Sequence, residues 1–260
     1  MPSRHGPEDP ILPSGPALCG ENVVTVQFTR KGRPLEIVME SAGPVALIGG
    51  GEVPDPVAER LLSLCGPVVA ADGGADWLLR HGRMPDAVIG DMDSLSLTRQ
   101  RHLPPDRLFR IAEQDSTDFE KCLSRIAAPL VMGTGFLGQR ADHMLAALTV
   151  LARYPERRCL LAGPEDIVFL CPPELALERP RGERFSLWPL GPVRGRSEGL
   201  EWPIDGLGFA PDDRVGTSNR ISGPLRLHME APAMLVLMPV AALEEVAARL
   251  LSAPGSWPAR

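Results

Sequence analysis

The chain alternates short apolar runs with segments of helical spacing from residue 45 to residue 170. The apolar runs read "VALI", "PVVAA", "DAVI", "RLFRIA", "PLVM", "RCLLAG" and "DIVFL". The segments "DPVAERLLSLC", "ADWLLRHG", "TDFEKCLSRIA" and "ADHMLAALTVLARY" place apolar residues three or four positions apart, which predicts amphipathic helices. Strands that alternate with helices form a parallel sheet covered on both faces. The sequence therefore predicts an α/β domain over residues 43–172.

The pattern changes after Cys171. Between residues 172 and 239, short apolar runs are broken by Gly and Pro, which is typical of an all-β region. The last segment, "VAALEEVAARLLSA", has helical spacing. We therefore expect a smaller all-β domain over residues 173–260 that ends in a helix.

The first 42 residues are expected to be an N-terminal extension, partly disordered. Residues 1–22 are broken by Pro and Gly and lack the continuous apolar segment of a signal peptide. The segments "VVTVQF" and "PLEIV", joined through "RKG", predict a β-hairpin. Because Met39 stands just before the first strand of the α/β pattern, residues 1–38 are either an extension or a mis-assigned start.

The composition is that of an ordinary globular protein, with 44% hydrophobic and 23% charged residues. The formal net charge of -6 argues against a general nucleic-acid binder, and no apolar run has the length of a membrane span. The five cysteines are an odd number without C-x-x-C spacing, which argues against a disulfide framework or a zinc site. We therefore expect a cytoplasmic protein that binds neither nucleic acid nor a membrane.

The segment "GDMDS" places two carboxylates, Asp91 and Asp93, directly after an apolar run. On an extended segment, residues i and i+2 point to the same side. Two like charges that close would raise each other's pKa unless a cation pairs with them, and no basic residue stands beside them in the sequence. Oxygen ligands without His or Cys fit Mg²⁺ better than Zn²⁺. The segment therefore predicts a magnesium site.

Polar residues follow three further strands of the predicted sheet, at the edge where ligands bind in parallel sheets. They are Asp72, Gly73 and Gly74 after one strand, Gln114, Asp115, Thr117 and Asp118 after another, and Gly133, Gly135, Gly138, Arg140, Asp142 and His143 after a third. Arg140, Lys121 and the N–H groups of the glycine loops are available for phosphate oxygens. This edge therefore predicts Mg²⁺ with a phosphorylated ligand.

Each of these groups also has a structural interpretation, which the sequence leaves open. Asp72 with the two glycines fits a tight turn. Thr117 fits a helix N-cap, with Glu120 reaching back in a capping box, and Asp118 would be favoured by the helix dipole. Arg140 and Asp142 fit a surface ion pair, and His143 fits a satisfied residue at a helix start.

The ordered segments "ADGGADWLL", "PDAVIGDMDSL", "EQDSTDFEKCL", "GTGFLGQRADHMLAAL", "GLEWPI" and "GTSN" resemble the thiamine pyrophosphokinase family over roughly residues 45–239. The resemblance implies a Rossmann-like parallel sheet domain followed by a smaller β-sandwich. It also implies a homodimer whose active sites lie between the α/β domain of one subunit and the β domain of the other. The implied reaction transfers the pyrophosphoryl group of ATP to the hydroxyl of thiamine, which gives thiamine diphosphate and AMP.

The resemblance also implies roles for individual residues. Asp91, Asp93 and Asp118 would hold Mg²⁺ and the ATP phosphates, with Asp72 as a supporting acid. The expected nucleotide contacts are Gly73, Ser94, Gln114, Asp115, Thr117, Lys121 and Arg140. Ser218, Asn219 and Asp142 would bind thiamine, Ser218 and Asn219 in the partner's site. Either Asp142 or Asp118 would accept the proton of the attacking hydroxyl.

The chain departs from the family pattern in three places. Gln139 follows Gly138 where the family usually has a second glycine, and Arg220 follows "GTSN" where an acid is common. No aromatic residue follows "SN", and Trp202 is expected in the core rather than as a substitute. Two alternatives therefore stay open: a pyrophosphokinase for another primary alcohol, such as a hydroxymethylpterin, and a non-catalytic nucleotide-binding regulator. An oxidoreductase is disfavoured because the G-x-G-x-x-G fingerprint is absent.

Overall fold

The computed structural model describes residues 29–30, 33–34, 36–95, 97–138 and 140–259. The chain divides into two compact units, Met1–Pro34 and Leu35–Arg260. In the first unit, β1 (Thr29–Arg30) pairs antiparallel with β2 (Arg33–Pro34), so strand pairing is present around the predicted "RKG" turn. The first predicted hairpin strand, residues 23–28, and the predicted disorder of residues 1–22 lie outside the described residues.

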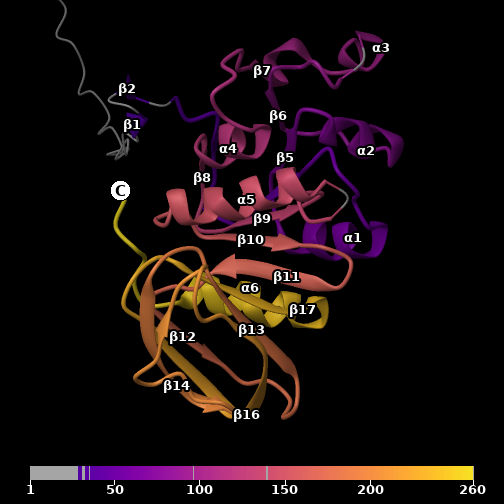
Figure 1. Cartoon of the computed structure of the whole chain (residues 1–260). Helices are drawn as coiled ribbons and strands as arrows, with labels where there is room; N and C mark the ends of the chain where they lie inside the picture. Colours follow the sequence, from indigo (N-terminus) through magenta and orange to yellow (C-terminus); the bar gives the residue numbers. More distant parts are fainter. Residues whose placement is uncertain (1–28, 31–32, 35, 96, 139, 260) are drawn as a thin grey trace, which may run out of the picture. The chain divides into compact units, whose positions relative to one another are not determined.

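The second unit is built on one sheet of 13 strands, ordered β15-β14-β16-β13-β17-β11-β10-β9-β4-β5-β6-β7, with β12 paired to β16 (Figure 1). From β10 to β7 every neighbouring pair is parallel. The parallel strands are β4 (Val45–Ile48), β5 (Val68–Ala71), β6 (Ala87–Gly90), β7 (Leu108–Arg110), β9 (Val131–Thr134) and β10 (Cys159–Ala162).

The remaining strands of this sheet pair antiparallel. They are β11 (Asp166–Leu170), β12 (Glu174–Leu177), β13 (Arg184–Pro189), β14 (Val193–Leu200), β15 (Gly208–Phe209), β16 (Gly216–Met229) and β17 (Met234–Pro239). A separate parallel pair joins β3 (Met39–Glu40) to β8 (Ile126–Ala127).

The predicted mixed α/β fold is confirmed, but the sheet has no break where the sequence changes character. β11 pairs antiparallel with β10 on one side and with β17 on the other, so hydrogen bonding continues from the parallel half into the antiparallel half. The apolar run of β11 is what a strand buried on both faces requires. The Gly- and Pro-rich composition beyond it therefore marks a change in strand direction within one sheet.

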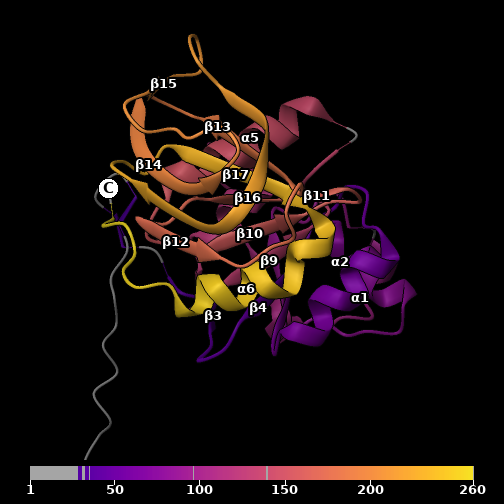
Figure 2. The same cartoon turned by 90° about the horizontal axis from the view of Figure 1, so that it is seen from below.

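Helices cover both faces of the parallel half, because alternate strand residues point to opposite faces. Ala46 and Ile48 face one apolar core, which α1, α2 and α6 also line, whereas Val45 and Leu47 face a second core, lined by α4 and α5. Figures 1 and 2 show α5 and α6 on opposite sides of the sheet. The helices are α1 (Asp55–Leu64), α2 (Gly74–Arg80), α3 (Leu97–Gln100), α4 (Asp118–Leu123), α5 (Ala141–Arg153) and α6 (Leu243–Ser252), with the 3₁₀ helices η1 (Pro105–Arg107) and η2 (Val240–Ala242). None of the helices in the described part of the chain has the length and apolar character that a membrane span requires.

The glycine run after β4 serves close packing. The Gly49 N–H donates to the Thr134 carbonyl at 2.8 Å, and the Gly51 N–H donates to the Gly135 carbonyl at 3.1 Å. A Cβ on Gly49 would lie 2.6 Å from the Gly135 oxygen, so a larger residue would separate the loops that follow β4 and β9. The loops that follow β4 and β9 therefore pack closely against each other. The acidic residues gather farther along the same edge, beyond β5 and β6.

Candidate functional site

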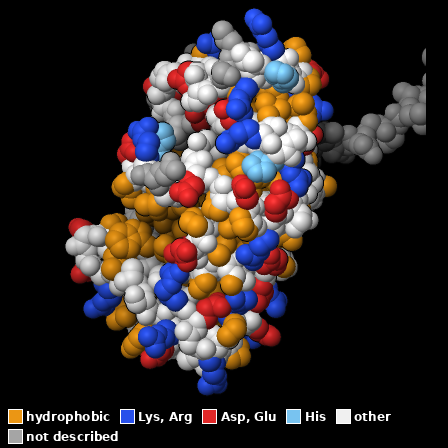
Figure 3. All heavy atoms as spheres, turned by 90° about the vertical axis from the view of Figure 1, so that its right-hand side faces the viewer, with side chains coloured by type: hydrophobic (Ala, Val, Ile, Leu, Met, Phe, Trp, Pro, Cys, Tyr) orange, Lys and Arg blue, Asp and Glu red, His pale blue; other side chains and the backbone are white. Residues whose placement is uncertain are grey.

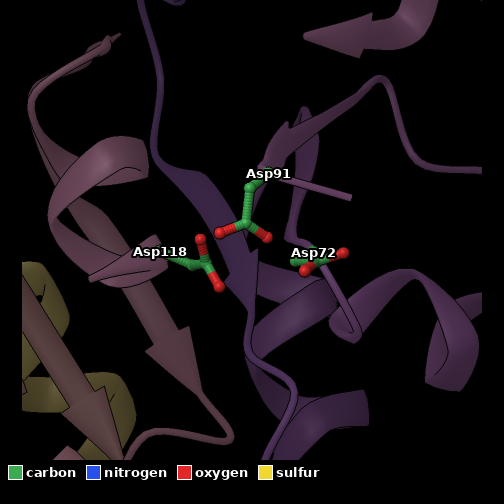
Figure 4. A group of neighbouring side chains, drawn as sticks. All are labelled: Asp72, Asp91 and Asp118. Carbon is green, nitrogen blue, oxygen red and sulfur yellow. The ribbon is translucent and has the colours of Figure 1, made fainter. Parts of the chain in front are cut away.

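Three aspartates from three different elements meet at the carboxyl edge of the parallel strands. Asp72 follows β5, Asp91 follows β6, and Asp118 is the first residue of α4. One carboxylate oxygen from each lies within 4.8 Å of the others. Figure 4 shows the three side chains pointing toward one another. The residues that the sequence placed on separate strands are thus brought together at one point.

Asp72 is the most confined member of this aspartate group. It is only 1% exposed and has a left-handed backbone, with φ at 39°. Its Oδ2 accepts a hydrogen bond from the Ser94 N–H at 3.2 Å, whereas its Oδ1 is buried without a hydrogen-bond partner among the described residues. Burial raises the pKa of Asp72 to about 6, against the Ser94 hydrogen bond and with help from the Asp118 charge. A buried carboxylate oxygen that lacks a donor fits a cation.

The group contains a basic residue that the reasoning on "GDMDS" did not foresee. Lys121 is 2% exposed, and its Nζ donates to Asp91 Oδ2 at 3.2 Å and to Asp118 Oδ1 at 3.0 Å. No basic residue stands beside Asp91 in the sequence, yet the fold brings one to it, so the chain itself supplies a cation to this group. The sequence carried one signal for this pairing, because Lys121 stands three positions after Asp118, which is a neighbouring position on a helix.

Lys121 also helps to keep Asp91 ionised. Burial is the largest single influence and by itself raises the pKa of Asp91, but the hydrogen bonds from Lys121 and the Asp93 N–H, together with the Lys121 charge, outweigh it, and the pKa falls to about 2. In turn, burial lowers the pKa of Lys121, but the Asp118 and Asp91 carboxylates outweigh it, so that pKa lies above its ordinary value. The expected upward shift of the carboxylate pKa values is therefore right for Asp72 and wrong for Asp91.

Asp93 lies outside the three-oxygen group. Met92 has φ at 67°, so the segment from Asp91 to Asp93 turns instead of staying extended, and the assumption of an extended segment is wrong. Asp93 is exposed, its N–H donates to Asp91 Oδ1 at 3.3 Å, and its Oδ1 accepts from the Ser94 hydroxyl at 3.1 Å. Asp93 therefore lies at the exposed rim of the aspartate group, whereas Asp72 is its buried, inner member.

Other predicted nucleotide residues surround the group. Gln114 Nε2 donates to Asp91 Oδ2 at 3.2 Å, so it fixes the same oxygen as Lys121. Gly73 precedes α2, and a Cβ placed on it would lie 3.5 Å from the Ser94 Cβ. Asp115 is exposed on the loop before α4.

Thr117 is the predicted N-cap of α4. Its hydroxyl oxygen accepts from the Glu120 N–H at 3.3 Å, which confirms the cap. The second half of the predicted capping box is wrong, because the Glu120 carboxylate turns away from Thr117. It accepts instead from the Arg153 guanidinium at 2.5 Å and from the Tyr154 hydroxyl at 3.0 Å. Glu120 therefore ties α4 to α5.

Arg140 and Asp142 form an exposed ion pair at the start of α5. Arg140 Nη2 donates to Asp142 Oδ2 at 2.6 Å, and His143 is exposed in the same turn. In the single chain, Arg140 and Asp142 thus form the surface ion pair that their structural interpretation predicts. The Arg140 hydrogen bond lowers the pKa of Asp142 to about 2, which makes the carboxylate a weak base while the pair persists.

Asn219 holds the backbone of an exposed tryptophan. Its Nδ2 donates to the Trp202 carbonyl at 2.7 Å, and its Oδ1 accepts from the N–H groups of Trp202 at 3.2 Å and Arg220 at 2.8 Å. Trp202 is 54% exposed, so its expected place in the core is wrong. Asn219 itself is buried, whereas the neighbouring Ser218 is exposed.

Backbone strain coincides with the predicted site. Among the described residues other than glycine, three have positive φ, namely Asp72 at 39°, Met92 at 67° and Ser218 at 64°. Two of them were predicted as site residues, and Met92 joins Asp91 to Asp93. Strained conformations of this kind persist mainly where function requires them.

Comparisons with known proteins match the part of the chain that contains this aspartate group. The family model described as "Thiamin pyrophosphokinase, catalytic domain" matches residues 58–161, which include the whole aspartate group. Thiamine pyrophosphokinase 1 of Arabidopsis thaliana is 27% identical over 187 residues, which cover 59% of this chain and 70% of the relative. Thiamine pyrophosphokinase 1 of Oryza sativa subsp. japonica is 28% identical over 185 residues, which cover 58% of this chain and 70% of the relative.

Solved structures share the fold. The yeast thiamin pyrophosphokinase superposes with a TM-score of 0.65 at 18% identity, covering 85% of this chain and 95% of that one. The thiamin pyrophosphokinase from Geobacillus thermodenitrificans gives a TM-score of 0.63 at 21% identity, covering 75% of this chain and 96% of that one. The catalytic-domain match, the curated relatives and the shared fold agree, and each of them makes the chain similar to thiamine pyrophosphokinases.

Proposed function

We propose that the protein transfers the pyrophosphoryl group of ATP to the hydroxyl of thiamine, which gives thiamine diphosphate and AMP. The observation that carries the proposal is the convergence of Asp72, Asp91 and Asp118 within 4.8 Å, inside the region that matches the family's catalytic domain. Such a transfer depends on placing the reactants in line and on neutralising phosphate charge. A compact acidic group that binds a divalent cation serves that neutralisation.

The donor set fits Mg²⁺. It consists of carboxylate oxygens without His or Cys, and the Asp72 Oδ1 is buried without a hydrogen-bond donor. We propose Asp91, Asp118 and Asp72 as the inner ligands and Asp93 as a rim ligand, directly or through water. When bound, Mg²⁺ would neutralise negative charge on the ATP phosphates.

Residues around the aspartate group would hold the nucleotide. Gln114 and Thr117 lie at the group and at the start of α4, where the N–H groups of a helix end favour anions. Gly73, Ser94 and Asp115 are proposed as further contacts. Arg140 is exposed and able to exchange Asp142 for phosphate oxygens, since a surface ion pair is weak.

The proton acceptor for the thiamine hydroxyl is proposed to be Asp118 or Asp142. The pKa of Asp142 is depressed to about 2 by the hydrogen bond from Arg140. If Arg140 turned toward phosphate, that depression would be relieved and the carboxylate would become a better base.

We propose that the enzyme is a homodimer with an α/β catalytic domain over residues 43–172 and a β-sandwich thiamine-binding domain over residues 173–260. Ser218 and Asn219 would contribute to the partner's site. Exposed apolar side chains support a covering subunit: Leu145 on α5 is 59% exposed, and Trp202 is more than half exposed. Figure 3 shows hydrophobic side chains gathered in the middle of the face at the right-hand side of Figure 1.

We propose that the enzyme acts in the cytoplasm. The four described cysteines, Cys65, Cys122, Cys159 and Cys171, are free thiols. Free thiols of this kind are usual in a reducing compartment.

Product analysis tests the proposed reaction. The protein is incubated with Mg-ATP and thiamine, and the nucleotide product and the modified acceptor are identified by chromatography and mass spectrometry. AMP with thiamine diphosphate is the expected result. ADP would indicate an ordinary kinase, AMP formed only with a hydroxymethylpterin would indicate another acceptor, and the absence of turnover with any acceptor would indicate a regulator.

A further inference from the structure

We infer that Lys121 is the built-in counter-ion of the aspartate group, and that it positions Asp91 and Asp118 for the metal instead of binding phosphate. The inference rests on the proposed metal role of this group. It concerns a different property, namely how three carboxylates stay together in the folded protein when no divalent cation is bound.

Some carboxylate oxygens of the group accept a hydrogen bond from the protein, and others do not. Lys121 Nζ holds Asp91 Oδ2 at 3.2 Å and Asp118 Oδ1 at 3.0 Å, while the Ser94 N–H holds Asp72 Oδ2 at 3.2 Å. Each carboxylate therefore has at least one oxygen held by a donor of the protein, and Asp91 has both, because its Oδ1 accepts from the Asp93 N–H. The opposite oxygen of Asp72 is buried without a donor among the described residues, which leaves it to a cation.

Burial argues against a phosphate contact by Lys121. The side chain is 2% exposed, lies between two carboxylates and extends from a helix whose neighbouring residues Phe119, Cys122 and Leu123 are buried in the core. To reach a phosphate, the ammonium would have to leave both carboxylates, which would then remain close together and uncompensated. Breaking a buried pair in this way is strongly unfavourable.

The charge balance gives Lys121 a distinct role in stability. Among the ion pairs of the described residues, Lys121 alone joins Asp91 and Asp118, so without it the three carboxylates would converge with less positive charge beside them, and the fold would depend more on a bound cation. With Lys121, the group is partly balanced before Mg²⁺ arrives and stays correctly oriented for it. Lys121 therefore makes the folded state less dependent on metal, and its removal should make stability depend on Mg²⁺.

Thermal unfolding with and without metal tests this role. Lys121→Met keeps the length of the side chain and removes the charge. Its Tm in EDTA is expected to fall by roughly 6–20 °C relative to the unaltered protein. Addition of MgCl₂ alone should recover roughly half of that loss or more, since the bound cation replaces the missing charge. The rise in Tm caused by Mg²⁺ should therefore be larger in this variant than in the unaltered protein.

Two further variants separate this role from packing. Leu123→Ala, on the same helix and fully buried, should lower Tm to the same extent with and without Mg²⁺. Adding Asp118→Asn to Lys121→Met removes one negative charge, and it should raise the Tm in EDTA above that of Lys121→Met alone. If Lys121→Met does not fold in either buffer, this double variant decides: folding in EDTA supports the counter-ion role, and failure to fold overturns it.

Other outcomes overturn the inference in distinguishable ways. An equal loss of Tm in both buffers means that Lys121 acts through packing alone. An unchanged Tm in EDTA, together with a smaller stabilisation by Mg-ATP, means that it binds phosphate. If the unaltered protein itself gains no stability from MgCl₂ or from Mg-ATP, the proposed metal role fails, and the counter-ion role fails with it.

Discussion

The side chain of Asp72 packs directly over the backbone of Gly90. A Cβ on Gly90 would lie 2.7 Å from the Cβ of Asp72, closer than two such atoms come in folded proteins. Gly90 ends β6, next to Asp91, and Asp72 follows the neighbouring strand. The glycine of "GDMDS" is therefore required because Asp72 needs the space that a side chain would fill.

Gly90→Ala should displace Asp72 and disrupt the aspartate group while leaving most of the fold intact. Turnover is expected to fall by roughly 100-fold, since a displacement of about 1 Å is enough for such a loss. Steady-state kinetics with Mg-ATP and thiamine measures the effect. Gly66→Ala is the matched control, because a Cβ there meets no atom within 4 Å, and it should retain full activity.

Asp91→Asn and Asp93→Asn compare an inner with a rim position. Asp91 belongs to the three-oxygen group and is held by Lys121 and Gln114, whereas Asp93 is exposed. We expect Asp91→Asn to reduce turnover by roughly 100-fold or more, and to abolish the rise in Tm that Mg²⁺ causes. Asp93→Asn should also reduce turnover but keep part of that rise. Equal retention of the Mg²⁺ effect in both variants would contradict the inner place of Asp91.

Asp72→Asn should stabilise the metal-free protein at neutral pH. The pKa of Asp72 is about 6 in the folded protein against an ordinary value of 3.8. Ionisation of Asp72 therefore costs folding free energy; the cost begins above about pH 4 and is complete above about pH 6. In EDTA at pH 7, the variant should exceed the unaltered protein in free energy of unfolding by up to about 3 kcal/mol. Urea unfolding of both proteins at pH 4 and pH 7 tests this. A difference in free energy of unfolding that is the same at both pH values would contradict the prediction.

Asn219→Ala should affect both stability and thiamine binding. The substitution removes three hydrogen bonds that involve the backbone of Trp202 and Arg220, which is expected to cost about 2–4 kcal/mol of stability. The KM for thiamine should rise as well, because Asn219 is itself a proposed thiamine contact. Differential scanning fluorimetry and steady-state kinetics measure the two effects, and an unchanged Tm would show that the bonds to Trp202 carry no stability.

Ser218→Gly tests the residue next to Asn219 without removing the hydrogen bonds that Asn219 makes. Ser218 has φ at 64°, a conformation that glycine adopts without strain, so stability should stay equal or rise by up to about 1 kcal/mol. If the hydroxyl contacts thiamine as proposed, the KM for thiamine should nevertheless rise. An unchanged KM would remove Ser218 from the thiamine site.

Much of the parallel half of the sheet could be predicted because its signals are local. The run "VALI" becomes β4 at the same residues, and "ADHMLAALTVLARY" becomes α5, one residue shorter. The predicted helix over residues 117–127 instead ends at Leu123, and residues 126–127 form β8, which pairs with β3. That pairing joins segments far apart in the sequence, so hydrophobic spacing near residue 126 contains no sign of it.

The aspartate group could be predicted in outline, but its internal contacts could not. The rule that parallel strands place their carboxyl ends at one edge was sufficient to bring Asp72, Asp91 and Asp118 together. The turn between Asp91 and Asp93, in contrast, rests on the positive φ of Met92, which no propensity of methionine indicates. Likewise, the pairing of Lys121 with Asp91 depends on how α4 packs over β6, and this is a tertiary contact.

The fate of the β-phosphorus of ATP tests the central claim most directly. The protein is given Mg-ATP labelled at either the α- or the β-phosphorus, with thiamine, and the products are separated. If the pyrophosphoryl group moves as one unit, the β-label appears only in thiamine diphosphate and the α-label only in AMP, and folded Asp118→Asn gives neither product. A β-label that remains in a nucleotide product, or an Asp118→Asn variant with full turnover, would contradict the account.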